Sequence, residues 1–241
     1  MKGTTPEGTA GEQQAAAYVR DMFAQIAPRY DLLNHLLSFN IDRYWRSRTV
    51  DRVRPVLNRK EARVIDLCCG TGDLTLAFAD ASGASIFGSD FCHPMLTAAR
   101  TKSHGRDRWF EADALRLPVA DASVDLVSAA FGFRNLANYD EGLKEMRRVL
   151  RPGGMAAILE FSQPPNPVFA GLYGFYSKRV LPRIGGMISG SREAYKYLPE
   201  SVRKFPGAEE LADRMRSAGF ADARFERMTF GIVALHTGKV T

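Results

Sequence analysis

The stretch that decides the fold is VIDLCCGTGDLT, residues Val64–Thr75. Apolar residues lead into Asp66, a turn carrying Gly70 and Gly72 follows, and Asp73 stands where the next segment begins. An apolar strand that runs into a glycine-rich turn and then a helix is typical of parallel α/β sheets, in which the turn brings the backbone close to a ligand. The stretch therefore indicates a ligand-binding turn with an acid on either side of it.

Outward from this turn the sequence alternates between strand-like and helix-like segments. Each expected strand is a short apolar run, as is typical of strands buried on both faces. Alternating strands and helices predict a parallel α/β sheet with helices on both faces. The expected strands span 62–69, 84–91, 109–112, 124–132 and 155–161, and the expected helices span 73–81, 94–102 and 139–150.

Two further strands follow at the C-terminal end and meet near Gly231. Parallel neighbours need a crossover of a dozen or more residues, and no such length separates these two strands. The sequence therefore predicts an α/β, Rossmann-like sheet that is mostly parallel and ends in a C-terminal antiparallel hairpin. N-terminal helices and a helical insertion are added to this sheet.

The rest of the chain divides into parts around the sheet. Residues 1–14 are polar and are predicted to be a disordered leader, whereas 15–241 form a single domain. Residues 15–58 of that domain form an N-terminal helical region. Residues 162–206 are rich in proline, glycine and aromatic residues and are too long for a simple connection, so they are interpreted as a lid or substrate insertion.

The composition is ordinary for a soluble globular protein: of 241 residues, 45% are hydrophobic and 25% are charged. The three cysteines have no framework spacing and the polar N-terminus has no signal-peptide core, so a cytoplasmic location is expected. The net charge of +6 is not accompanied by regularly spaced stacking aromatics, so no nucleic acid partner is expected. Two basic stretches, 43–55 and 176–183, suit either solubility or an anionic membrane surface.

The acids around the turn decide against a phosphate ligand. Dinucleotide-binding turns read G-x-G-x-x-G, but the third glycine position is Thr75 here. Asp73 at the helix start would repel a phosphate, whereas Asp66 and Asp73 together suit a ligand that carries positive charge. Asp90 ends the second strand, where a ribose-binding acid is expected, and Asp113 ends the third, where it can accept from an adenine amino group. Each acid alone would also suit a helix cap, but as a set they predict S-adenosylmethionine.

Four stretches carry a more specific signal: VIDLCCGTGDLT, ALRLPVADASVDLVSAAFGFRN, EMRRVLRPGGMAAILEFSQP and VLPRIGGMISGSREAYKYLPESVRKFP. Together they resemble the UbiE-type ubiquinone/menaquinone biosynthesis C-methyltransferases, from about Tyr18 to the C-terminus. The first stretch alone would indicate only a class I methyltransferase. The resemblance implies a class I methyltransferase sheet. It also implies transfer of a methyl group from S-adenosylmethionine to a ring carbon of a polyprenylated quinol, with S-adenosylhomocysteine as the product.

The resemblance also implies cofactor contacts at Thr71, Asp90, Asp113 and Ala114. At Ala130, family members often have serine, so one hydroxyl contact is in doubt. No metal is expected, because the adjacent Cys68 and Cys69 have no His or Cys cluster with them. With the acids and the turn, the expected cofactor-binding residues are Asp66, Gly70, Thr71, Gly72, Asp73, Asp90, Phe91, Asp113, Ala114 and Ala130.

Methylation of a quinol ring carbon requires removal of a phenolic proton, so the site must stabilise a phenolate. Arg134, in FGFRN, is the catalytic candidate for that task, although its guanidinium is too basic to take the proton. With Asn135 it could hold a water that relays the proton. The alternative is an ion pair between Arg134 and an acid such as Glu141. Tyr30 either covers the cofactor or packs as an ordinary helix residue.

The insertion mixes aromatic and basic residues, which favours a channel for the polyprenyl tail and transient contact with an anionic membrane surface. The alternative is a small helical cap with an ordinary core. The expected partners are therefore the polyprenylated quinol and the membrane, with a homodimer or a quinone-synthesis assembly also considered. The residues concerned are Tyr173, Phe175, Tyr176, Lys178, Arg179 and Arg183.

Other functions remain open at this point. The chain could methylate another small molecule, or it could be a non-catalytic subunit that binds S-adenosylmethionine. An NAD(P) oxidoreductase is disfavoured by the missing third glycine. The ring type, naphthoquinol or benzoquinol, stays open because the family methylates both.

Overall fold

The computed structural model describes residues 2–105, 108–176, 179 and 192–241. Its centre is a seven-stranded sheet in the order β3-β2-β1-β4-β5-β7-β6. β1 to β5 pair in parallel, and β7 is antiparallel to both β5 and β6, so the expected sheet with its antiparallel C-terminal pair is confirmed. The strands are β1 (Arg63–Leu67), β2 (Ser85–Asp90), β3 (Trp109–Glu111), β4 (Val124–Ala130), β5 (Leu150–Phe161), β6 (Ala221–Met228) and β7 (Val233–Lys239).

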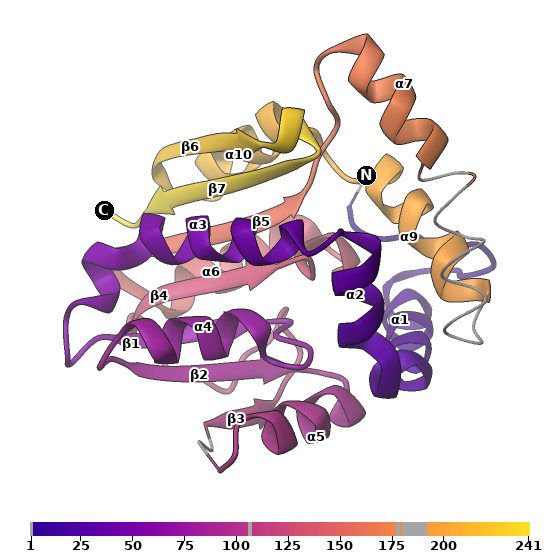
Figure 1. The fold of residues 1–241 in the computed structure, drawn as a ribbon. Coiled ribbons are helices and arrows are strands. Elements are labelled where there is room, and N and C mark those ends of the chain that lie inside the picture. Colours follow the sequence, from indigo (N-terminus) through magenta and orange to yellow (C-terminus); the bar gives the residue numbers. More distant parts are fainter. Residues whose placement is uncertain (1, 106–107, 177–178, 180–191) are drawn as a thin grey trace.

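Helices cover both faces of the sheet (Figure 1). Successive residues of β4 point to opposite faces, so Leu126 packs in one core with Trp45 and Phe78, and Val127 packs in another with Leu143. The helices on the first face are α3 (Ile41–Leu57) and α4 (Asp73–Ala81), and those on the second are α6 (Tyr139–Val149) and α10 (Ala208–Ser217). Both cores are apolar, as strands buried on two sides require.

The strand order reverses direction between β1 and β4, because the chain continues from β1 to β2 on one side and from β4 to β5 on the other. In sheets of this kind ligands bind outside the carboxyl ends of the strands, at this reversal. The helices beside these carboxyl ends are α1 (Glu12–Ile26), α2 (Tyr30–Leu37), α5 (His93–Lys102) and α9 (Arg192–Lys204) (Figure 1). The fold therefore encloses the expected site under a helical cover.

The N-terminal helices and the helical insertion are present as expected. The short 3₁₀ turn η1 (Ala27–Arg29) joins α1 to α2, and α7 (Pro167–Phe175) begins the insertion after a cap by Asn166, whose side chain accepts from the N–H of Val168. Lys178 and Arg183, two of the basic residues expected to face lipid, lie outside the described residues. None of the described helices is long and apolar enough to cross a membrane.

The start of the chain differs from the disordered leader that its composition predicts. Thr4 is buried, its N–H donates to the carbonyl of Leu136 at 2.8 Å, and the carbonyl of Lys2 accepts from the N–H of Tyr139 at 2.6 Å. Gly3 lies so close to Ala137 that a Cβ would meet its carbonyl oxygen at 2.0 Å. A polar segment can order in this way because backbone hydrogen bonds to a fixed turn replace those to water.

The fifth strand also starts earlier than expected. The sequence predicts a helix up to 150 and a strand from 155, but α6 ends at Val149 and β5 already begins at Leu150. The strand register shifts here, since Val124 pairs with Leu150 and Leu126 pairs with Met155. Gly153, at φ 78°, takes up the irregularity within the strand.

Candidate active site

The turn after β1 has a left-handed backbone that only glycine adopts without strain. Gly70 and Gly72 have φ angles of 57° and 86°. At Gly72 a Cβ would meet the ring of Trp109 at 2.4 Å, so the turn also needs the space. At Gly70 the nearest neighbour is the ring of Tyr30, 3.6 Å from the position of a Cβ. The turn is therefore shaped by β3 on one side and covered by α2 on the other.

Asp90 fixes this turn to the end of β2. Its Oδ2 accepts from the N–H of Gly70 and its Oδ1 accepts from the N–H of Cys92, both at 2.9 Å. The side chain is 7% exposed, and burial raises the pKa of its carboxyl while the two N–H groups lower it. Each carboxylate oxygen accepts more than one hydrogen bond, so Asp90 keeps acceptor capacity for a ligand hydroxyl.

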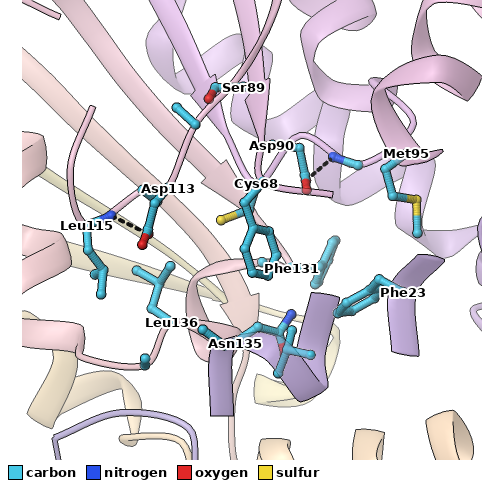
Figure 2. Close-up of a pocket in the computed structure, with 18 of the residues that line it drawn as sticks. Phe23, Cys68, Ser89, Asp90, Met95, Asp113, Leu115, Phe131, Asn135 and Leu136 are labelled. Atoms are coloured by element: carbon cyan, nitrogen blue, oxygen red, sulfur yellow. Dashed lines mark hydrogen bonds between the residues drawn. The ribbon is translucent and has the colours of Figure 1, made fainter. Parts of the chain in front are cut away.

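A cavity lies beside Asp90, between the carboxyl ends of the strands and α1 (Figure 2). Asp113 also lines it, with Oδ1 accepting from the N–H of Leu115 at 2.9 Å. Ser89 contributes a buried hydroxyl for which no described residue is a partner. We call this space the cofactor cavity. Of the residues expected from the sequence, it brings together Tyr30, Gly70, Asp90, Phe91, Asp113, Ala114 and Asn135.

The two acids that flank the turn do not line this cavity. Asp66 is 1% exposed and accepts from the hydroxyls of Ser128 at 2.6 Å and Thr75 at 2.7 Å. Burial raises the pKa of Asp66 to about 6, and the two hydroxyl donors oppose that rise. Asp73 lies 3.2 Å from a guanidinium nitrogen of Arg46. Both acids were expected to attract a cationic ligand. In the structure, hydroxyls of the protein bind Asp66 and a cation of the protein pairs with Asp73.

Three other expected cofactor residues also lie outside the lining of the cofactor cavity. Thr71 is 3% exposed and its hydroxyl donates to Asp31. Gly72 faces Trp109, and Ala130 packs against the core shared with α3. Their assignment as cofactor contacts stays a prediction.

A chain of charges connects the turn to the N-terminal helices. Lys102 bridges Asp31 and Asp73, and Arg46 bridges Asp73 and Asp42. Nearby cations lower the pKa of the Asp73 carboxyl, although burial opposes this. Nδ1 of His35 donates to Oδ2 of Asp42 at 2.8 Å, and His35, Asp42 and Asp73 place three metal-ligating atoms within 4.8 Å of one another. The guanidinium of Arg46 contacts the carboxylates of both Asp42 and Asp73, so a positive charge already lies between them.

A second and larger cavity, of about 330 Å³, lies next to the first. Its walls come from α1, α2, α3, α7 and α9 and are mostly apolar and aromatic. We call it the acceptor cavity. It shares the lining residues Phe23, Tyr30 and Phe131 with the cofactor cavity, and we call these three residues the partition, because they mark the boundary where the two spaces adjoin.

Phe131 holds its place in this partition at a cost in backbone strain. It follows β4 with φ 58°, a left-handed conformation that is rare for a bulky residue. Its ring packs 4.8 Å from that of Phe161 and 5.7 Å from that of Trp45, and the Arg46 guanidinium lies 5.7 Å from its centre. Strain of this kind, over-determined by packing, is often found at functional sites.

Arg134 lies in η2 (Phe133–Asn135) and lines the acceptor cavity. It is 5% exposed and pairs with Glu160, at 3.2 Å between Nη1 and Oε2, while Glu141 contacts Lys144 instead. Its Nε is buried without a partner among the described residues. The alternative expectation was an ion pair between Arg134 and an acid such as Glu141. Arg134 does form an ion pair, but with Glu160, and its Nε has no partner among the described residues.

Asn135 and Tyr30, the other two candidate catalytic residues, both line the cofactor cavity. Asn135 lines the cofactor cavity and accepts from the hydroxyl of Tyr197 at 3.0 Å, whereas Arg134 lines the acceptor cavity, so the two neighbours face different spaces. Tyr30 lines both cavities. Burial raises the pKa of its phenol, and a hydrogen bond with Asn34 acts in the opposite direction.

Two residues of this site are not among those expected from the sequence. Glu160 is the last residue but one of β5, and the signal for it was an acid near the end of an apolar strand, much as for Asp90. Arg46 lies in the basic stretch 43–55, which by its sequence suits either solubility or an anionic membrane surface. It is largely buried between Asp42 and Asp73, because the helix turns this one arginine inward.

Comparisons with known proteins agree on one family and one fold. The model of the ubiE/COQ5 methyltransferase family matches residues 10–240. The chain is 51% identical to the demethylmenaquinone methyltransferase of Thermus thermophilus, over 90% of this chain and 99% of that one. It is 46% identical to the ubiquinone/menaquinone biosynthesis C-methyltransferase UbiE of Syntrophotalea carbinolica, over 91% and 92%. A solved SAM-dependent methyltransferase from Thermotoga maritima superposes with a TM-score of 0.64 at 18% identity, covering 92% and 99%.

Proposed function

Because this chain belongs to the ubiE/COQ5 methyltransferase family, we propose that it transfers a methyl group from S-adenosylmethionine to a ring carbon of a quinol during the synthesis of a respiratory quinone. One observation carries the proposal beyond the family. The cofactor cavity and the acceptor cavity share a partition of three aromatic rings, Phe23, Tyr30 and Phe131. Methyl transfer needs the methyl carbon and the ring carbon in direct contact, so the two reactants would meet where the cavities adjoin beside these rings, as groups that the protein has already positioned.

The cofactor cavity has the donors and acceptors that S-adenosylmethionine needs. Asp90 and Asp113 offer carboxylates to the ribose hydroxyls and the adenine amino group. The buried Ser89 hydroxyl, which lacks a partner among the described residues, fits a further polar atom of the ligand. S-adenosylmethionine supplies an electrophilic methyl group when it is bound. The apolar rings of the partition keep water away from that group.

The acceptor cavity suits the quinol ring. Its lining is mostly apolar, which fits a flat hydrophobic ring, and Arg134 brings a guanidinium that is paired with Glu160 to its wall. A phenolate that forms in the cavity is stabilised by this guanidinium, more strongly than in water because the surroundings are apolar. Arg134 keeps its own proton, so the phenolic proton would leave through a bound water beside it that relays the proton to solvent. Tyr30 covers the ring from the α2 side.

A polyprenyl tail would leave the acceptor cavity through an apolar rim. We define the rim as the exposed large hydrophobic side chains of the described residues, all of which belong to α2, the α2–α3 connection, α3, α7 and η4 (Thr229–Gly231). Phe39, Ile41 and Leu172 of this rim also line the cavity. The rim residues are Leu32, Leu36, Phe39, Ile41, Tyr44, Val168, Leu172, Phe175 and Phe230.

The backbone holds two rim aromatics outward. Phe39 and Phe230 have φ angles of 52° and 57° and are 72% and 66% exposed. An exposed aromatic in a strained conformation indicates a surface with a partner. We propose that the rim enters the headgroup boundary of an anionic membrane, with the exposed base Arg43 next to the rim residue Tyr44 in α3. The chain would then be a cytoplasmic enzyme that associates with the membrane peripherally.

Two tyrosines that were expected at the membrane surface lie inside the acceptor cavity instead. Tyr173 and Tyr176 line the acceptor cavity, and the hydroxyl of Tyr176 donates to the carbonyl of Leu37 at 2.8 Å. Phe175 is exposed and remains part of the rim. A homodimer or an assembly with other enzymes of quinone synthesis stays a prediction.

The quinones of a strain that lacks this chain test the proposed function. Loss of the ring-methylated quinone, with accumulation of a precursor that lacks one ring methyl group, is expected. The mass of the precursor identifies the ring as a naphthoquinol or a benzoquinol. An unchanged quinone pool would contradict the proposal and favour another small-molecule substrate.

A further inference from the structure

Glu160 ties the end of β5 to η2 and to the side chain of Arg134. It is 0% exposed. Its Oε1 accepts from the N–H of Arg134 at 3.0 Å, and its Oε2 accepts from the N–H of Phe161 at 2.9 Å. The same two oxygens lie 3.3 and 3.2 Å from Nη1 of Arg134. The carboxylate therefore fixes both the backbone and one terminal nitrogen of this arginine.

Within the described part of the chain, Nη1 makes all the hydrogen bonds of the Arg134 guanidinium. Besides Glu160, it donates to the carbonyl of Phe131. Nε is buried without a partner. Nε–H and Nη2–H form the parallel pair of donors with which arginine binds an anionic oxygen. Anchoring Nη1 thus leaves this pair of donors for a group in the acceptor cavity, which Arg134 lines.

We infer that Glu160 is a positioning residue for the methyl transfer, because it holds Nη1 of Arg134 so that Nε–H and Nη2–H remain for the oxygen of the bound quinol. The inference rests on the proposed function. A buried ion pair contributes little to stability, since the cost of removing two charges from water offsets their attraction. The pair does keep the acceptor cavity neutral for an uncharged quinol, and it fixes the guanidinium before a phenolate forms.

The chain offers a matched control in Asp125 of β4. Asp125 is also buried, it pairs with Arg59 at 2.9 Å and Arg151 at 3.1 Å, and it accepts from the N–H of Arg63 at 2.9 Å. It lies at the amino end of its strand, away from both cavities. Asp125→Asn therefore removes a comparable buried charge without touching the site.

A double-mutant cycle on the full-length chain tests the inference, with a short-tailed demethylated quinol as acceptor. Glu160→Gln should lower kcat by about 10-fold or more when Arg134 is present, and by less than about 2-fold in an Arg134→Gln background. The affinity for S-adenosylmethionine should stay within about 2-fold in all variants. Asp125→Asn should lower the melting temperature without changing kcat.

The pH profile separates positioning from mere stability. In Glu160→Gln the charge of Arg134 is no longer neutralised, so the phenolate is favoured and the acidic limb of kcat should move to lower pH. Glu160→Asp keeps the charge but is one methylene shorter, so kcat should fall while the limb stays in place. This second variant decides the question if Glu160→Gln does not fold.

Three outcomes would overturn the inference: an unchanged kcat in Glu160→Asp, an unshifted limb in Glu160→Gln, or an equal loss of kcat with and without Arg134. Failure of the proposed function looks different. In that case the unmodified chain would methylate no quinol at all, whatever residue stands at position 160.

Discussion

Arg134 and Asp90 face different cavities, and their replacement should therefore change different constants. Arg134→Ala removes the charge that stabilises the phenolate, so kcat should fall by about 10²-fold or more. Asp90→Ala removes a buried acceptor, so S-adenosylmethionine should bind more weakly by about 1.5–3 kcal/mol. Steady-state kinetics with a short-tailed quinol and calorimetry with the cofactor measure the two effects.

Each of these two variants is the control for the other. Arg134→Ala should hardly change cofactor affinity, and Asp90→Ala should keep much of its turnover at saturating cofactor. If Arg134→Ala lost the cofactor while keeping turnover, the roles assigned to the two cavities would be reversed.

Asp66 gives a pH-dependent prediction at the same scale. Burial raises its pKa from 3.8 to about 6, so the folded chain keeps this proton at pH values where the unfolded chain has released it. The stability that the proton contributes is fully present below about pH 4 and is lost as the pH rises through 6. Asp66→Asn has no proton to lose. Its free energy of unfolding, relative to the unmodified chain, should rise between pH 4 and pH 7 by up to about 3 kcal/mol.

Denaturant unfolding of both chains at several pH values measures this difference. The comparison cancels the titration of all other groups, because they are common to both chains. A difference that stays constant from pH 4 to pH 7 would contradict the buried, proton-holding role of Asp66 and would support a carboxylate that stays charged.

At the scale of elements, we expect a substitution in the connection between α2 and α3 to keep or raise stability while it weakens membrane binding. Phe39 lies there at φ 52°, and asparagine tolerates this conformation better than phenylalanine. Phe39→Asn should therefore keep or raise the free energy of unfolding and should weaken co-sedimentation with vesicles that contain phosphatidylglycerol. Ala122→Asn is the matched control, since Ala122 has φ 48° in the turn before β4, outside the rim. It should gain stability with no change in vesicle binding.

The result against the rim would be vesicle binding that Phe39→Asn leaves intact. If high salt abolished that binding, the basic exposed side of α3 would be the docking surface instead. If the chain bound no vesicles under any condition, the peripheral membrane location would be wrong.

How far the sequence predicts these elements depends on whether local or distant residues decide them. The parallel strands, their helices and the C-terminal antiparallel pair could be predicted, because apolar runs and short turns are local signals. Asp90 could be placed at the site because it ends a strand. The partners of Asp73 could not, since Arg46 and Lys102 come from helices before and after it and meet it only in the folded chain.

The same distinction explains the candidate site. Arg134 was found from its motif, but its partner Glu160 is 26 residues away and pairs with it only because β5 lies beside β4. The order at the start of the chain depends on the turn before α6, and no composition signal carries that contact. Of the rim, Phe175 could be anticipated from the insertion, but Phe39 and Phe230 could not, because the φ angles of such single residues follow from tertiary packing.

At the scale of the whole molecule, the two cavities are assembled from elements that the sequence keeps far apart. The parallel sheet supplies the floor of the cofactor cavity, and the N-terminal helices and the insertion supply the walls of the acceptor cavity. The aromatic partition is where the two sets of elements meet. The account therefore requires that a methyl group pass directly from the cofactor to a ring carbon at this place, and to no oxygen or nitrogen atom.

The most direct measurement of that claim uses the purified chain, S-adenosylmethionine with an isotopically labelled methyl group, and reduced demethylmenaquinone and its benzoquinol counterpart in parallel. We expect the label on a ring carbon of at least one of the two quinols, located by carbon NMR, with one S-adenosylhomocysteine formed for each methyl group transferred. Label on a quinol oxygen, or no transfer to either ring while S-adenosylmethionine binds, would contradict the account.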